Sequence, residues 1–344
     1  MTQRVIDKVL RAYSAAVQPQ CVTDLGAAGG FSGAHFWRVT TDHGDLCFRK
    51  WPPGHPDALH LQYIHEVLHT ARASGLNVIP VPFSTVDGQT FLAESDHLWE
   101  LTPWMPGRAD YWRLPTRQRL ANALTCLAEF HAATRKMETN LAPSPGIAQR
   151  TQFLQKLVSQ SARELRTAAS ASSLGWHNLQ IRADRLLRLF DAAAEPTQKA
   201  LETCRQLVVR HQPCIRDIWH DHLLFEGEEV RGIVDFGAMR HDHVATDISR
   251  LLGSLVNDDP IGWDTGLAAY QSVQSLTAEE LRLIRVFDMS SVVLSGMNWL
   301  CWIYLEGRRF ENRTAIEKRL DGIIQRFEHL VGKDGYSRPN RTAY

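Results

Sequence analysis

The feature that most constrains the fold is one β-like segment between long stretches of helical periodicity, CIRDIWHDHLLFEGEEVRGIVDFG (214–237). It contains two short strand patterns, HLLF (222–225) and VRGIVDF (230–236), joined by the turn-like EGEE. Asp217 precedes this predicted hairpin and Asp235 lies at its end. Because the two ends of a hairpin are close in space, we expect both carboxylates to converge on one site.

Two carboxylates placed in this way suit phosphoryl transfer. One carboxylate can orient or deprotonate the attacking hydroxyl, and the other can hold the magnesium that bridges nucleotide phosphates. Both residues could instead be ordinary turn carboxylates. The matching sequence context on either side of them favours the functional interpretation.

The first quarter of the chain is strand-rich. FWRVT (36–40) and LCFRKW (46–51) flank a turn, and the glycine-rich LGAAGGFSGAH (25–35) precedes them. A helix is predicted over 57–74 with Gly75 after it, and an amphipathic helix at the N-terminus. Three further strands are predicted, in VIPVP (78–82), TFLAES (90–95) and HLWELTPW (97–104).

Helical periodicity dominates the rest of the chain, over 117–136, 149–169, 180–210, 277–306 and 314–331. A sheet-rich part followed by a helix-rich part with one hairpin predicts an α+β fold with two lobes. The sequence MPG (105–107) interrupts the pattern. We therefore expect an N-lobe over residues 1–105 and a C-lobe over 106–344.

Composition excludes several classes of protein. The 344 residues are 44% hydrophobic with a formal net charge of zero, which argues against a nucleic-acid footprint or an electrostatic membrane anchor. No signal peptide or window of membrane-spanning length is expected. The six cysteines form no CxxC pair, so reduced, buried thiols and a cytoplasmic location are predicted.

The hairpin segment resembles the catalytic core of the aminoglycoside phosphotransferase and choline kinase-like superfamily, which is itself similar to protein kinases. The family pattern is H-G-D-x-x-x-x-N, a short strand and then I-D-F/W-G/E. Asp217 stands at the catalytic Asp, His222 at the metal-binding Asn and Asp235 at the second metal ligand. LAEFHAAT around His131 and ATDISRLLG around Asp247 also resemble family helices. The resemblance implies a bilobal protein-kinase-like fold.

The N-terminal motifs follow the family in the same order. The glycine-rich loop, with Gly30 and Ser32, would approach the nucleotide phosphates. Strand alternation in LCFRKW puts Arg49 on one face, and Phe48 with Lys50 on the other. This strand stands where relatives carry the phosphate-anchoring cation, for which Arg49 is favoured and Lys50 stays open. Glu66 matches the helix acid that pairs with this cation.

LWELTPWMPG (98–107) resembles the family hinge. The resemblance therefore implies that backbone atoms near Pro103, Trp104 and Met105 meet the adenine.

Two departures from the family pattern concern the catalytic loop. Ile215-Arg216 replaces His-Gly before the catalytic Asp, and His222 replaces the usual Asn. Magnesium prefers oxygen ligands, whereas a histidine offers nitrogen. The alternatives left open are a single magnesium, a preference for manganese, or a weakened site in which His222 is only hydrogen-bonded.

Acceptor contacts are predicted at two places. Trp219 and His220 follow Asp217, and Trp302 and Glu306 lie four residues apart on a helix, where an aromatic ring and an acid would suit a cationic acceptor. The alternatives are loop packing and a buried aromatic helix face. The cluster His-Asp-His (241–243) is not expected to bind zinc, because no four-ligand set is complete.

The motifs together predict phosphorylation of a hydroxyl on a small metabolite by ATP (or GTP) with Mg²⁺ or Mn²⁺. Acceptors handled by the family include amino sugars, sugars, amino alcohols and homoserine. The main alternative is a nucleotide-binding pseudokinase that acts as a binding module, because the family His and Asn are missing. A protein kinase is a third option, disfavoured by the LAEFHAAT signature.

Overall fold

The computed structural model describes residues 3–27, 33–137, 140–171, 175–310 and 312–332. The chain forms two compact units, each built from several segments. Unit 1 comprises Met1–Met137, Ile215–Arg240 and Thr265–Gln274, and unit 2 comprises Glu138–Cys214, His241–Asp264 and Ser275–Tyr344. Unit 1 carries an antiparallel sheet and unit 2 is mainly helical, so the predicted α+β class is confirmed.

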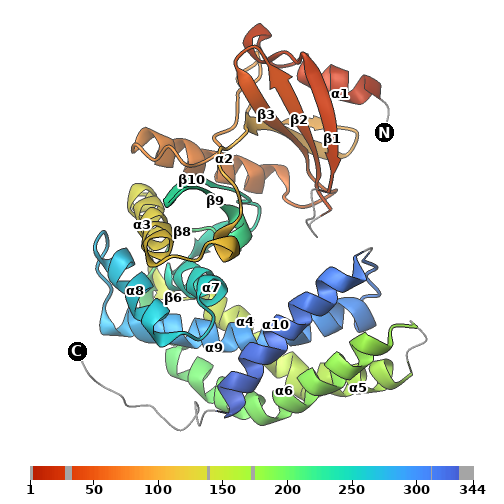
Figure 1. Ribbon diagram of the computed structural model, residues 1–344, viewed down its shortest axis with the longest axis vertical. Helices are drawn as coiled ribbons and strands as arrows, with labels where there is room; N and C mark the ends of the chain where they lie inside the picture. Colours follow the sequence, from red (N-terminus) through yellow and green to blue (C-terminus); the bar gives the residue numbers. More distant parts are fainter. Residues whose placement is uncertain (1–2, 28–32, 138–139, 172–174, 311, 333–344) are drawn as a thin grey trace. The chain divides into compact units, whose positions relative to one another are not determined.

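The sheet of unit 1 has five strands in the order β1-β2-β3-β5-β4. Figure 1 shows β1, β2 and β3 side by side. Its strands are β1 (Cys21–Gly26), β2 (His35–Thr41), β3 (Gly44–Lys50), β4 (Leu92–Glu94) and β5 (His97–Pro103). The hairpin between β4 and β5 turns at Ser95 and Asp96, which both have positive φ, of 52° and 60°. Two positive φ angles in a two-residue loop match the right-handed twist of the flanking strands.

Side-chain alternation gives the two faces of this sheet different roles. On one face Trp37, Phe48 and Trp99 stack on one another and pack with α1 (Gln3–Leu10) in a hydrophobic core. Residues one position along each strand, including Arg49 and Glu100, must therefore point to the opposite face. The predicted division of Phe48 and Arg49 between two faces is confirmed.

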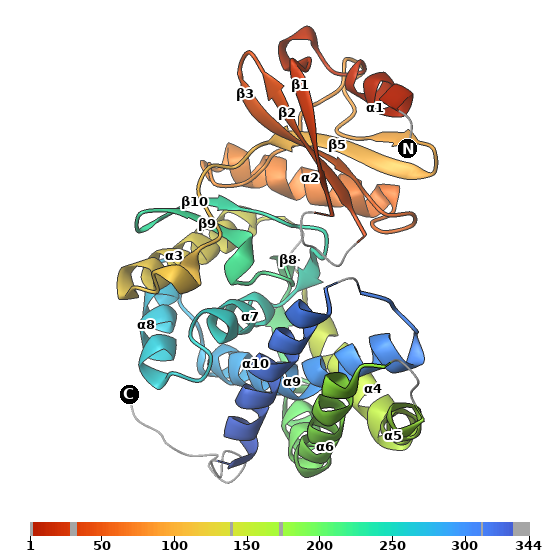
Figure 2. The same cartoon turned by 45° about the vertical axis from the view of Figure 1, so that its right-hand side comes forward.

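Helix α2 (Ala58–Ala73) lies beside the sheet in both views (Figures 1 and 2). The Asp57 side chain caps its first turn by accepting from the His60 amide at 2.8 Å. Gly75 follows with a φ of +95°, a left-handed conformation that glycine adopts without strain. The helix predicted over 57–74 is therefore confirmed at both ends.

The predicted hairpin after Asp217 consists of β9 (Leu223–Glu226) and β10 (Glu229–Ile233), and α3 (Arg117–Thr134) packs on it. Arg108 and Phe225 exchange two backbone hydrogen bonds of 3.0 and 2.9 Å, which tie the segment after β5 to β9. A Cβ on Gly107 would lie 3.0 Å from the backbone of Phe225. Only glycine permits this close approach.

Unit 2 contains most of the helices (Figure 2). They are α4 (Pro145–Lys156), a π-helical turn (Leu157–Ser161), α5 (Ala162–Ser170), α6 (His177–Cys204), α7 (Ala245–Leu255), α9 (Ala278–Leu300), a second π-helical turn (Cys301–Leu305) and α10 (Arg313–Gly332). The short strands β6 (Leu141–Pro143) and β7 (Val208–Arg210) pair, as do β8 (Gln212–Cys214) and β11 (Arg240–Asp242).

Two sequence expectations differ from this fold. The strand predicted in VIPVP is wrong, because residues 78–82 form an irregular segment. Pro80 and Pro82 lack the amide protons that a strand ladder needs. Helix α8 (Pro260–Gln271), which begins in unit 2 and ends in unit 1, was not predicted from its weak amphipathic pattern.

One described helix, Ala278–Leu305, is long and apolar enough to cross a membrane, with a mean hydropathy of 1.2 in its most apolar window. This corrects the expectation that no window reaches that length. However, 67% of the window is buried inside the protein, and a core helix passes the same test of length and composition. The helix is therefore only weak evidence for a membrane span.

A buried ion pair in unit 2 predicts a pH dependence of stability. Asp288 of α9 lies 3.1 Å from the Arg326 guanidinium, in space that Gly253 leaves open. Burial raises the pKa of Asp288 to about 6, although Arg326 favours its charged form. The native state therefore keeps a proton that the unfolded chain releases near pH 4, so the free energy of unfolding falls as pH rises from about 4 to 6.

We expect D288N to remove this decline, which amounts to roughly 2–3 kcal/mol for a shift of about two pKa units. The measurement is denaturant unfolding of the wild type and D288N at several pH values between 4 and 7. The matched control is D184N, which changes an exposed aspartate of α6. Parallel pH curves for the wild type and D288N would contradict the prediction.

Candidate functional site

An unusual backbone conformation occurs at both ends of the predicted hairpin, next to Asp217 and at Asp235 itself. Arg216, just before Asp217, has a φ of 66°, and Asp235 has a φ of 63°. Positive φ is strained for residues with a side chain and is concentrated at functional sites. Arg216 occupies the position where the family pattern has glycine, so the left-handed backbone explains that glycine physically.

His222 connects the two ends of the hairpin. Its Nδ1 lies 2.7 Å from the main-chain oxygen of Asp217, and its Nε2 lies 3.7 Å from the Asp235 carboxylate. Both contacts come from the short 3₁₀ turn that leads into β9. The structure therefore brings the Asp217 main chain and the Asp235 carboxylate to the same imidazole. The convergence of the two carboxylates stays a prediction.

The hydrogen bonds of His222 define its tautomer. A carbonyl oxygen only accepts, so Nδ1 donates to Asp217. The Trp219 indole N–H only donates, and it points at Nε2 over 2.8 Å, so Nε2 accepts. The lone pair that a metal would need on Nε2 is already used by Trp219.

Arg49, the predicted phosphate-binding cation, lies in a row with one residue from each of the two neighbouring strands. Strand register places Phe36 of β2 opposite Arg49 of β3, and Arg49 opposite Glu100 of β5. The Arg49 guanidinium lies over the Phe36 ring at 4.7 Å and over the Trp51 ring at 4.4 Å, and Nε is 3.6 Å from Glu100. The two aromatic faces and the acid hold the guanidinium in one orientation.

Arg49 also reaches the hairpin. Its terminal nitrogen lies 3.7 Å from Asp235, whose side chain is 41% exposed while that of Arg49 is 14% exposed. Lys50 is on the opposite face of β3, and burial lowers the pKa of its ammonium group. Of the two cations left open by the sequence, Arg49 is the one that the structure places beside Asp235.

The predicted pairing of Arg49 with Glu66 is wrong. Glu66 is exposed on α2 and accepts a hydrogen bond from Gln62 at 3.0 Å. The acid beside Arg49 is Glu100, from the neighbouring strand. Sequence analysis missed it because strand register, which sets cross-strand neighbours, depends on the whole sheet.

The Asp-Phe-Gly sequence is packed from both sides. Phe236 is buried and its ring lies 5.8 Å from that of Phe130 of α3. A Cβ on Gly237 would approach the Trp51 ring to 3.0 Å. Because Trp51 also stacks on the Arg49 guanidinium, the glycine allows the hairpin end and the cation to share one aromatic side chain.

The predicted hinge, residues 98–107, begins within β5 and continues beyond its last residue, Pro103. Pro103 has no N–H, and the Trp104 amide donates to the Asp45 carbonyl at 3.1 Å, so neither amide is available to an adenine. Met105 is buried, and Gly232 of β10 leaves room for its Cβ. Adenine recognition through the amides of Pro103 and Trp104 is therefore excluded.

Gly30 and Ser32 lie outside the described residues. Trp219 and His220 are half-buried and pack edge to face, with ring centroids 4.6 Å apart. Trp112, which is 46% exposed, packs in the same manner on His220 at 6.0 Å. Sequence analysis missed Trp112, since a single aromatic residue in a loop gives no periodic signal.

In unit 2 the chain's own Arg308 contacts both Trp302 and Glu306, the predicted aromatic and acid pair. The Arg308 guanidinium lies 4.7 Å from the Trp302 ring centroid and 2.8 Å from the Glu306 carboxylate. Trp302 also packs on Trp299, with centroids 5.1 Å apart. The arrangement thus fits a cation chemically, and the chain itself supplies one.

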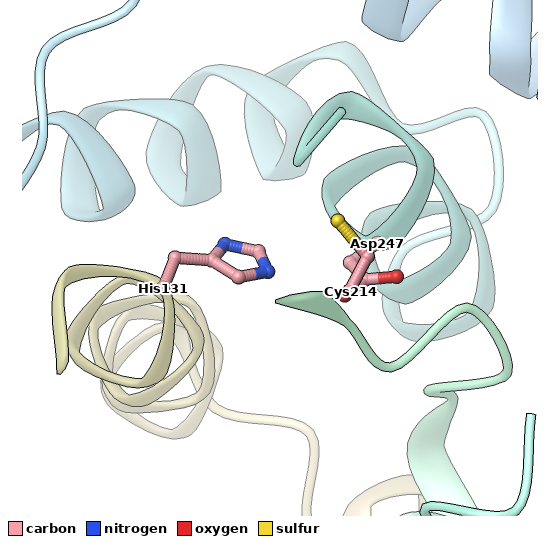
Figure 3. A group of neighbouring side chains, drawn as sticks. All are labelled: His131, Cys214 and Asp247. Atoms are coloured by element: carbon pink, nitrogen blue, oxygen red, sulfur yellow. The ribbon is translucent and has the colours of Figure 1, made fainter. Parts of the chain in front are cut away.

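In unit 1, His131, whose surrounding sequence resembles a family helix, projects from α3 (Figure 3). Its Nδ1 lies 2.8 Å from the Tyr270 hydroxyl. In unit 2 the Cys214 sulfur lies within 4.8 Å of the Asp247 carboxylate (Figure 3). The Cys214 thiol donates to the Asp242 carbonyl at 3.3 Å, so it is not the thiolate that binds metals. In the His-Asp-His segment, the His243 imidazole contacts the Glu280 carboxylate, and the Asp242 carboxylate accepts a hydrogen bond from the Ser144 hydroxyl.

The contact between Trp219 and His222 makes a testable prediction about metals. We expect W219F to free the Nε2 lone pair beside Asp235 and to raise Co²⁺ or Zn²⁺ affinity by about tenfold, since nitrogen ligands favour these metals over Mg²⁺. Calorimetry and the visible absorption of Co²⁺ measure the change. The double variant W219F/H222Q should lose the gain, and unchanged Co²⁺ binding by W219F would contradict the assigned tautomer.

The sequence matches the model of the phosphotransferase enzyme family over residues 25–284, and the chain belongs to this family. None of the curated proteins compared with it matches. Among solved structures it is similar to spectinomycin phosphotransferase in complex with ADP and spectinomycin (12% identity, 96% of this chain and 94% of that chain covered, TM-score 0.65).

Two further solved structures show the same fold over almost the full length. One is an amicoumacin kinase in complex with AMP-PNP and Ca²⁺ (15% identity, 98% and 95% covered, TM-score 0.62). The other is a microcompartment-associated aminopropanol kinase (14% identity, 97% and 99% covered, TM-score 0.64). The predicted family and the predicted kinase-like fold are therefore confirmed.

Proposed function

We propose that this protein is an ATP-dependent phosphotransferase that phosphorylates a hydroxyl of a small metabolite. The observation that carries the proposal is the connected set in unit 1 formed by the Asp217 loop, His222, Asp235 and Arg49. A cation and a carboxylate 3.7 Å apart beside a catalytic-loop aspartate are the parts that phosphoryl transfer requires. The solved relatives with ADP and AMP-PNP support nucleotide use.

Each side chain has one task in this proposal. Asp217 orients the acceptor hydroxyl and receives its proton, and Arg49 contacts the nucleotide phosphates. The adenine meets the backbone at Met105, and the phosphate-binding roles of Gly30 and Ser32 are kept as the sequence predicts them. Residues 1–105 supply the nucleotide contacts, and residues 106–344 supply the catalytic loop and the acceptor contacts.

Asp235 fits a divalent ion, because its exposed carboxylate supplies the oxygen ligands that Mg²⁺ prefers. His222 does not fit while Trp219 donates to its Nε2. We therefore assign the metal-holding role to Asp235 and a hydrogen-bonding role to His222. When bound, the ion neutralises charge on the phosphates.

The proposed acceptor class is an amino-bearing alcohol or sugar. The proposal is supported by the contacts that the Trp302 ring and the Glu306 carboxylate make with the Arg308 guanidinium, because an aromatic ring and an acid suit a cationic group. Aminopropanol, which appears in the name of one solved relative, belongs to this chemical class. Trp219 and His220 are proposed to contact the acceptor beside Asp217, and the proposed location is the cytoplasm.

The test is a screen of amino alcohols, amino sugars, sugars and homoserine with purified protein, ATP or GTP, and Mg²⁺ or Mn²⁺. Nucleotide-dependent phosphorylation of one acceptor class would support the proposal. The alternative is a pseudokinase binding module. Thermal stabilisation by ATP that does not depend on the metal, together with no product from any acceptor, would favour that alternative.

A further inference from the structure

Helix α2 directs a histidine, not its acid, toward the sheet. Leu61, Ile64, His65 and Leu68 are buried, at the spacing of three and four that marks one face of a helix. Glu66 is one residue further, about 100° around the helix axis, and is exposed. The position that matches the acid of kinase-like relatives therefore faces solvent, and its neighbour faces the site.

Both ring nitrogens of His65 have partners. Nε2 lies 2.8 Å from the Glu100 carboxylate, which only accepts, so Nε2 donates. Nδ1 lies 2.7 Å from the Thr90 hydroxyl, which can donate or accept. Because the His65 side chain is only 2% exposed, losing either partner would leave a buried polar group unsatisfied.

The two carboxylate oxygens of Glu100 contact different elements, one a residue of α2 and the other a residue of β3. Oε2 accepts from His65, and Oε1 faces the Nε of Arg49 at 3.6 Å. Burial would raise the pKa of the Glu100 carboxyl, but the His65 hydrogen bond and the Arg49 charge outweigh it and lower the pKa. Glu100 is therefore an ionised carboxylate whose orientation is held from two sides.

The contacts continue to the hairpin. The other end of the Arg49 guanidinium lies 3.7 Å from Asp235. The order of contacts is thus Thr90, His65, Glu100, Arg49 and Asp235. Each member of the set orients the next, and His65 is the member that comes from α2.

We propose that His65 is a positioning residue for the phosphate-binding cation. It fixes the Glu100 carboxylate, which in turn sets Arg49 against Asp235, so α2 acts on the nucleotide site through a histidine and a strand acid. This inference rests on the proposed phosphotransferase function. In this arrangement the helix does not supply an acid that pairs directly with the cation. Instead, His65 of α2 contacts Glu100, and Glu100 contacts Arg49.

The test compares the affinity for ATP with the affinity for adenosine, both with Mg²⁺ and both in competition with a fluorescent ATP analogue. We expect H65A to weaken ATP binding by about tenfold, the loss of roughly one hydrogen bond to a charged group. Adenosine affinity should stay within about twofold, because adenosine lacks the phosphates that Arg49 meets. H65Q, whose amide can still donate to Glu100, should recover most of the ATP affinity.

The matched control is H69A, one helical turn further along α2 and exposed. Loss of ATP and adenosine affinity in parallel in H65A would indicate a purely structural role and overturn the inference. Equal ATP affinity of H65A, H69A and the wild type would overturn it as well. Wild-type protein that binds neither ligand would overturn the proposed function and this inference together.

Discussion

D217N is expected to lower the rate of phosphoryl transfer by about 10²–10⁴-fold while leaving the ATP dissociation constant within about twofold of the wild type. An amide can still contact the acceptor hydroxyl, but it cannot take the hydroxyl proton. Asp217 is half-buried, and its main-chain oxygen accepts from His222, so the substitution leaves that contact in place. Initial rates with an identified acceptor, and calorimetric titration with ATP, measure the two quantities.

D87N is the matched control for this prediction, because Asp87 is an exposed turn residue of unit 1. It should retain wild-type rates and ATP affinity. A D217N variant that transfers phosphate as fast as D87N would refute the assignment of Asp217. A D217N variant that no longer binds ATP would show that the residue acts on the nucleotide instead.

D235N is expected to reduce phosphoryl transfer by about 10³-fold, because metal-assisted charge stabilisation contributes several kcal/mol and each 1.4 kcal/mol is tenfold in rate. It should also abolish most of the Mg²⁺ dependence of ATP binding. Asparagine tolerates the left-handed backbone at this position, where φ is 63°, better than alanine does. The measurements are rates and ATP affinities across a Mg²⁺ titration.

D96N provides a control with the same backbone conformation, since Asp96 has a φ of 60° and is exposed in the turn between β4 and β5. It makes the same chemical change in the same left-handed conformation. If D235N and D96N showed the same Mg²⁺ dependence, Asp235 would not be the residue that holds the metal. Loss of ATP affinity without loss of Mg²⁺ dependence would point to its contact with Arg49.

The arrangement around Arg49 shows how the same demand can be met by different residues. A phosphate-binding cation must be oriented. The free-energy cost of burying an acid beside it is smaller when other groups donate hydrogen bonds to that acid. Here the acid belongs to a strand, and the buried histidine of α2 supplies the link to the helix. The exposed Glu66 is then free of that constraint.

Local pattern was enough to predict several parts of the site. Alternation along β3 separated Arg49 from Lys50, and the hairpin between 217 and 235 brought the Asp217 main chain and the Asp235 carboxylate to His222. The helix over 57–74 was marked by its Asp57 cap and Gly75. These features depend on residues near one another in the sequence, where periodicity and turn chemistry act directly.

Partners from distant segments could not be predicted in the same way. The choice of Glu100 over Glu66 depends on sheet register and on which face of α2 is buried. The contact of Arg308 with Trp302 depends on the path of the chain after a π-helical turn. Such contacts follow from packing, which short sequence windows do not record.

Residues near one another in the chain were enough to predict the order of the motifs, the phosphotransferase family, and the hairpin that carries Asp217 and Asp235. Packing between distant segments set which groups meet there: Glu100 beside Arg49, His65 behind Glu100, and Trp219 on the nitrogen of His222. This difference arises because the two ends of a hairpin are close whatever surrounds them. A hydrogen-bond partner is chosen by register, helix rotation and burial, which only the packed fold sets.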